Sequence, residues 1–122
     1  MKPRRRLSGN ERRRMILDRA IELFADRGFH VVTMDEIAGA AGVTKSILYD
    51  HFPSKEGLYL AVCEEIRGRL LSTGEERIGQ AASFAARVRA GVEAFFRFAE
   101  ENPAAIRILL SRPRDEKKLV AA

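Results

Sequence analysis

The stretch "GVTKSILYDHF", residues 42–52, has the length and signals of a short helix but lacks part of the usual N-terminal cap. Thr44 is a typical N-cap residue. Three residues later stands Ile47, where a capping box would place Glu or Gln, and Lys45 adds positive charge to the positive end of the helix dipole. The unpaired N–H groups at the start of this helix therefore predict an anion-binding position.

The two faces of this helix differ in character. Leu48 and Phe52 are four residues apart, so they share one face, which we expect to pack into the core. The opposite face is polar and rich in donors, and it carries Lys45, Ser46, Tyr49 and Asp50.

Helix signals also dominate the sequence before this stretch, and no segment alternates as a clear strand would. A first helix is predicted from Ser8 to Gly28 and a second from Thr33 to Gly42, each opened by a Ser/Thr-x-x-Glu capping box. Gly42 can take a positive φ and turn the chain. Two short helices joined by such a turn have the spacing of a helix-turn-helix, whose second helix enters the major groove of DNA. In that setting Asp50 either accepts a hydrogen bond from a cytosine amino group or pairs with a nearby Lys or Arg.

Three more helices are predicted after Pro53, which gives an all-α fold. A fourth starts at Ser54 and continues into the glycine-containing stretch 68–79, where a linker or helix end is expected. A fifth starts near Ser83 with a predicted apolar stripe of Phe84, Val88, Val92, Phe95 and Ala99. Asn102 and Pro103 are predicted as the N-cap and first residue of a sixth, amphipathic through Ile106, Leu109 and Leu110.

The net charge of +5 is concentrated at the N-terminus. Residues 1–14 contain seven basic side chains against Glu11. A basic arm on a nearly neutral body indicates a polyanionic partner, either nucleic acid or an anionic membrane surface, and the alternative is a solubilising tail. We expect residues 1–7 to form a flexible arm in which Arg4, Arg5 and Arg6 contact DNA.

Composition excludes several other classes of protein. The chain has 122 residues, the length of one domain, and 46% of them are hydrophobic. No apolar stretch approaches the roughly 18 residues of a membrane span, and no secretory signal is recognisable, so we expect a cytoplasmic protein without a membrane partner. Cys63 is the only cysteine, and with His30 and His51 it lacks the spacing of metal ligands. We predict no enzyme, no cofactor and no metal site.

The run from residue 16 to 62 closely resembles the DNA-binding domain of the TetR (tetracycline repressor) family of bacterial transcriptional regulators. The resemblance rests on "A..LF...G" in the first helix, "T..EIA..AGV" in the second and "LY.HF.SKE.L" across the third and fourth. It implies that the third helix reads the major groove, with base contacts from Lys45, Ser46 and Ile47. It also implies phosphate contacts from Thr33, Thr44, Tyr49, His51 and Lys55.

Local structure bears on the assignment of three of these positions. Thr33 is first of all an N-cap. His51 falls between the two faces of its helix, so it either packs beneath the helix or bonds a phosphate. Lys55 begins the fourth helix, where a cation is unfavourable unless an anion is near.

The resemblance implies a sequence-specific DNA-binding transcriptional regulator, and we expect a repressor that a small-molecule inducer releases from its double-stranded operator. Residues 8–56 would form the helix-turn-helix domain and 57–122 part of a helical domain for ligand binding and dimerisation. The family forms homodimers through late helices that these residues do not include, so we expect a monomer or weak dimer. The alternative is a non-enzymatic interaction module whose basic arm binds anionic membrane or RNA.

Overall fold

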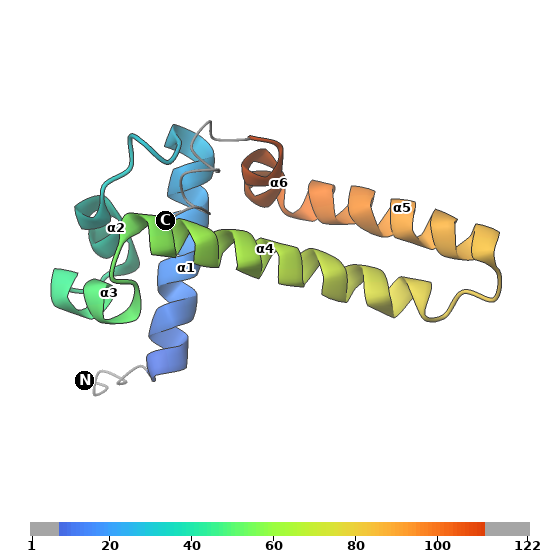
Figure 1. Ribbon diagram of the computed structural model, residues 1–122, viewed down its shortest axis with the longest axis horizontal. Coiled ribbons are helices and arrows are strands. Elements are labelled where there is room, and N and C mark those ends of the chain that lie inside the picture. Colours follow the sequence, from blue (N-terminus) through green and yellow to red (C-terminus); the bar gives the residue numbers. More distant parts are fainter. Residues whose placement is uncertain (1–7, 112–122) are drawn as a thin grey trace, which may run out of the picture.

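Six α-helices make up residues 8–111, the part of the chain that the computed structural model describes (Figure 1). They are α1 (Gly9–Arg27), α2 (Met34–Ala41), α3 (Lys45–His51), α4 (Lys55–Ile78), α5 (Phe84–Glu101) and α6 (Pro103–Leu110). The all-α prediction is confirmed. No helix within this range is both long and apolar enough to cross a membrane.

The first three helices begin and end where the sequence signals predict. The side-chain oxygens of Ser8, Thr33 and Thr44 each accept a hydrogen bond from the N–H three residues later, at 3.1, 3.1 and 3.2 Å. Gly42 has the left-handed backbone conformation, with φ of 68°, that an L-residue rarely adopts. The N–H of Val43 then bonds the carbonyl of Ala38 at 3.0 Å, which closes the turn between α2 and α3.

One hydrophobic core joins α1, α2, α3 and the first half of α4, and Phe98 of α5 and Ala105 and Ile108 of α6 also belong to it. The largest fully buried side chains are Ile16, Val32, Ile37, Leu48, Leu58, Val62 and Ile66. Phe24 and Phe29 each pack edge-on against Tyr59 of α4, with ring centroids 5.2 and 5.1 Å apart. α3 is therefore held at a fixed position on the outside of this core.

Beyond this core, α4 and α5 run side by side in opposite directions and form a limb (Figure 1). The predicted helix end within 68–79 is confirmed at the last residues of that stretch, since α4 reaches Ile78. Gly68 and Gly74 lie inside the helix without interrupting it. The predicted boundary between residues 56 and 57 falls in the first turn of α4, which continues through it.

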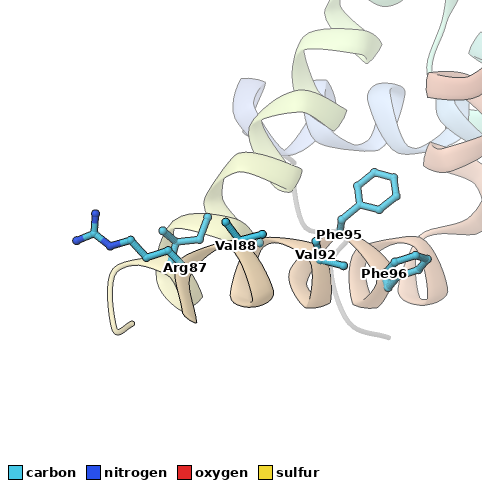
Figure 2. Close-up of a pocket in the computed structure, with 7 residues that line it drawn as sticks. Arg87, Val88, Val92, Phe95 and Phe96 are labelled. Carbon is cyan, nitrogen blue, oxygen red and sulfur yellow. The ribbon is translucent and has the colours of Figure 1, made fainter. Parts of the chain in front are cut away.

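The apolar stripe predicted for α5 does not face the core. Phe84 is 83% exposed, and Val88, Val92 and Phe95 are exposed as well, whereas Ala94 and Phe98 are the buried residues of α5. The reason is that, within residues 8–111, α4 and α6 cover only one side of α5. An open groove of about 510 Å³ is left, lined by Ile78, Arg87, Val88, Gly91, Val92, Phe95 and Phe96 (Figure 2).

Two expectations about the sixth helix also need correction. Asn102 makes no side-chain cap for α6 and instead donates through Nδ2 to the carbonyl of Phe98 at 3.1 Å, because its backbone turns the side chain toward the end of α5. Of the apolar residues predicted for α6, Ile106 packs against the core, but Leu109 and Leu110 are 37% and 74% exposed. The buried residues of α6 are Ala105 and Ile108.

Candidate nucleic-acid interface

The two faces of α3 are as the sequence predicts. Leu48 is completely buried and Phe52, the residue that ends the helix, is 3% exposed. The outward face is exposed and consists of Lys45, Ser46, Tyr49 and Asp50. The helix therefore presents a short row of donors to solvent while its apolar side chains attach it to the core.

The start of α3 retains hydrogen-bonding capacity for a ligand. Thr44 Oγ1 accepts from the N–H of Ile47, which satisfies only one of the donors at the end of the helix. Within residues 8–111, the N–H groups of Lys45 and Ser46 bond no acceptor. Donors at a helix N-terminus, in the positive field of the dipole, suit an oxyanion such as a phosphate.

Lys45 forms an ion pair that the sequence reasoning missed. Its Nζ lies 3.0 Å from Oδ1 of Asp35 in α2, with both side chains about two-thirds exposed. The hydrogen bond from Lys45 to Asp35, reinforced by the attraction of opposite charges, raises the pKa of Lys45. Asp35 lies in the first turn of α2, where an acidic residue suits the helix dipole, and the crossing of α2 and α3 also brings its carboxylate to Lys45.

Thr33 is confirmed as the N-cap of α2, and its hydroxyl is already engaged. Its Oγ1 accepts from the N–H of Glu36 and donates to Oε1 of the same residue at 3.3 Å. Arg27, the last residue of α1, forms an ion pair with that carboxylate. A phosphate contact by Thr33 stays a prediction, and it would have to share the hydroxyl with Glu36.

Lys55 does not need the external anion that its position at the start of α4 suggested. Its Nζ donates to the carbonyls of Phe29 at 2.7 Å and Val32 at 3.1 Å, and it lies 4.5 Å from the centre of the Phe29 ring. That argument for a phosphate is therefore wrong, because the two carbonyl oxygens supply the negative partial charge that a cation needs at the positive end of the α4 dipole. A phosphate contact by Lys55 stays a prediction from the family resemblance.

The remaining predicted positions are only partly placed. His51 is half-buried, with its ring centroid 6.3 Å from that of Phe52, between the exposed and the buried face. The ion pair expected for Asp50 is not formed with any residue from 8 to 111. Arg4, Arg5 and Arg6 lie outside the described residues.

One cation of α1 lies behind α3 and was not among the predicted site residues. The guanidinium carbon of Arg13 is 4.7 Å from the centre of the Phe52 ring, a cation–π distance. Arg13 is exposed, so its positive charge is accessible to solvent next to the Phe52 ring. The run of arginines at 12–14 was a signal for it, but the sequence did not show which of them turns toward α3.

A second charged cluster joins α1 to the limb. Arg69 of α4 donates to Asp18 at 2.8 Å and to Glu65 at 3.0 Å, and Arg14 of α1 pairs with the same Glu65 carboxylate. Partial burial by itself would raise the pKa of Glu65, but the hydrogen bonds from Arg69 and Arg14 outweigh it and lower that pKa. The described residues contain no group of His, Cys, Asp and Glu that could hold a metal ion.

Comparison with protein families gives one match over the helix-turn-helix. Residues 16–62 match the family described as bacterial regulatory proteins, tetR family. The chain is 42% identical over 117 residues to the HTH-type transcriptional activator FasR of Mycolicibacterium smegmatis, which covers 96% of this chain and 53% of FasR. It is 36% identical over 97 residues to the transcriptional regulator BetI of Rhizobium meliloti, covering 77% of this chain and 48% of BetI.

Solved structures show the same fold. A TetR-like transcriptional regulator from Rhodococcus sp. RHA1 superposes with a TM-score of 0.84 at 28% identity, over 95% of this chain and 63% of that one. The fatty acid degradation regulator FadR from Bacillus halodurans gives a TM-score of 0.82 at 20% identity, covering 96% and 59%, and this likeness shows the fold alone. The chain spans about half the length of the curated relatives it matches. These relatives are regulators of transcription and not enzymes, which confirms the prediction that the function is not catalysis.

Proposed function

We propose that this chain, whose residues 16–62 belong to the tetR family of bacterial regulatory proteins, binds a double-stranded DNA operator through α3. The observation that carries the proposal is the exposed N-terminal half of α3. There Lys45 and Ser46 stand beside two N–H groups without an acceptor among the described residues. A helix with this surface fits the major groove, where donors meet the acceptors of guanine and phosphates meet the helix N-terminus.

Within this proposal the predicted residues have different tasks. Lys45 and Ser46 contact base edges, and Tyr49, Thr44 and Thr33 contact phosphates, which fixes the register of the protein on the duplex. His51 and Lys55 add to the phosphate contacts, as the family resemblance implies, and Lys55 would have to share its ammonium with the carbonyls of Phe29 and Val32. Residues 1–7 supply a basic arm, 8–56 the reading domain and 57–122 part of a regulatory domain.

For the whole protein we propose a cytoplasmic repressor that a small molecule releases from DNA. The exposed apolar groove of α5 supports a role of the limb in ligand binding, because an apolar ligand or further helices would bury this groove (Figure 2). The second candidate is an activator, favoured by the fact that FasR is named a transcriptional activator. A promoter–reporter assay separates the two, since deletion of the gene raises expression from a repressed promoter and lowers it from an activated one.

Selection of bound sequences from random duplex DNA tests the proposal. The chain should enrich one sequence motif, and Lys45→Ala should change the preferred bases. Arg97→Ala is the control, because it removes an exposed cation from α5, far along the chain from α3, and should leave the motif unchanged. If Lys45→Ala keeps both motif and affinity, α3 is not in the groove.

The arm is tested separately by salt dependence. Each phosphate that is neutralised contributes about 0.9 to the slope of log K against log salt, and we expect the arm to engage only some of its four cations. Deleting residues 1–7 should therefore lower the slope by about 1 to 3 per protomer and keep the selected motif. An unchanged slope would identify the arm as a solubility tail. Binding to duplex DNA that does not depend on salt would favour an interaction module instead.

A further inference from the structure

Asp35 has a position that the proposed function does not yet use. It lies in α2, outside the reading helix, and its carboxylate reaches Nζ of Lys45 across the turn at 3.0 Å. Both helices are attached firmly, since Ile37 of α2 and Leu48 of α3 are completely buried. The turn between them is closed by the left-handed Gly42. The separation of Asp35 from Lys45 is therefore set by the packing of the helix-turn-helix and not by a flexible loop.

The ion pair of Asp35 and Lys45 contributes little to stability, and its main effect is to compensate the charge of Lys45. Both side chains are about two-thirds exposed, and exposed ion pairs add little to the free energy of unfolding. Lys45 also stands at the positive end of the α3 dipole, where an acidic partner offsets an unfavourable charge. The first turn of α3 has no acidic residue, so Asp35 supplies the negative charge from the neighbouring helix.

We propose that Asp35 is a positioning residue for DNA reading, which holds the Lys45 ammonium toward the base edges and away from phosphates. The inference rests on the proposed function of Lys45 as a base reader. Without Asp35 the flexible lysine would bind any nearby phosphate, which is a contact without sequence information. The carboxylate itself repels phosphates, so it weakens non-specific binding more than specific binding.

Asp35→Asn tests the role because it keeps the shape of the side chain and removes its charge. At low salt we expect binding to a scrambled duplex to tighten about two- to fivefold, in line with the size of exposed charge interactions. Binding to the duplex selected by the wild-type chain should tighten less or weaken, so the specificity ratio should fall. Asp35→Glu keeps the charge and should recover most of the ratio.

The matched control is Glu56→Gln. Glu56 occupies in α4 the same second helical position that Asp35 occupies in α2, it is exposed, and it pairs with no cation among residues 8–111. It should leave the specificity ratio unchanged. A fall as large as that of Asp35→Asn would show a general charge effect and overturn the proposal.

The double variant decides whether Asp35 acts through Lys45. In a Lys45→Ala background, Asp35→Asn should no longer change the specificity ratio. An equal fall in both backgrounds would mean that Asp35 contacts bases itself, and no fall in either would mean that it is only a surface charge. Both results overturn the proposal. Failure of the proposed function is distinct, because the wild-type chain would then select no duplex at all.

Discussion

The helix-turn-helix end and the α4–α5 limb use apolar residues in opposite ways. At the first, α3 turns Leu48 and Phe52 inward and leaves polar residues outside. In the limb, α5 turns Phe84 and Val88 outward, and no described residue covers them. Both α3 and α5 have a regular apolar stripe, so the periodicity of the sequence alone does not tell which of the two stripes is buried.

The difference shows that the helix-turn-helix end buries its own apolar side chains, whereas the α4–α5 limb leaves apolar side chains to be covered by something else. The core of the first end is closed by side chains of all six helices, including Phe98 of α5 and Ala105 and Ile108 of α6, and the free groups of α3 are mainly donors. The limb leaves an apolar groove that needs an apolar cover, either further chain, a ligand or another molecule. We therefore expect substitutions at the first end to act on folding and DNA binding separately, and substitutions on the exposed stripe to act on neither.

The largest expected effect comes from truncating the buried residue of α3. Leu48→Ala should lower the free energy of unfolding by about 2–5 kcal/mol, because it leaves a cavity in the core. Val88→Ala, on the half-exposed stripe of α5, should cost less than about 0.5 kcal/mol. Urea unfolding followed by circular dichroism measures both. Similar losses of unfolding free energy in both variants would mean that the stripe of α5 is covered in solution and that the two regions do not differ as described.

Tyr49→Phe should affect DNA binding and leave folding intact. The side chain is 43% exposed, so losing its hydroxyl should not change the unfolding transition. If the hydroxyl bonds a phosphate, affinity for every duplex should fall by about 0.5–1.5 kcal/mol per site, with the same preferred sequence. Fluorescence anisotropy with selected and scrambled duplexes measures this. A change in preferred sequence would assign Tyr49 to base reading.

The stability contributed by the charged cluster of Glu65, Arg69 and Arg14, which joins α1 to the limb, should depend on pH. Since the pKa of Glu65 is lowered in the folded chain, its contribution is complete above the ordinary value of 4.5 and is lost as the pH falls through the lowered pKa. Glu65→Gln should thus destabilise by about 0.5–1 kcal/mol at neutral pH and flatten the loss of stability on acidification. Thermal melts from pH 6 to 3 compare the two chains. Parallel curves would mean that the cluster with Arg69 does not form in solution.

The smallest effect is expected for self-association. The chain should be a monomer or weak dimer, with dissociation in the micromolar range or above. Sedimentation at several concentrations measures this, with Phe84→Ser as a variant that removes the most exposed aromatic ring of α5. Any weak association should decrease in that variant. A dimer that persists at nanomolar concentration would show that the limb supplies an interface of its own.

Local signals predicted most of the helix-turn-helix. Ser8, Thr33 and Thr44 cap helices as expected, and Gly42 has the left-handed conformation expected at the end of α2. Each of these caps and turns depends on residues at most five positions apart, so the local sequence contains everything that determines it. The spacing of Leu48 and Phe52 likewise identified the buried face of α3.

Contacts between distant residues could not be predicted in the same way. The pairing of Lys45 with Asp35 and the bonds from Lys55 to the α1–α2 loop depend on how helices cross. The exposed stripe of α5 depends on which elements pack against it. At Asn102 a local signal was itself misleading, because the side chain had two acceptable partners and bonded the end of the preceding helix.

The small buried footprint of α3 has a consequence for divergence among regulators. Only one of its seven residues is buried, and the exposed ones contribute little to holding the helix in place. Substitutions at Lys45 or Ser46 should therefore be nearly neutral for folding, and if α3 reads DNA as proposed they should alter the sequence that it recognises. A duplicated gene can accumulate such changes without passing through an unfolded intermediate. One scaffold can thus acquire a new target by a short series of single substitutions, each of which leaves a folded protein.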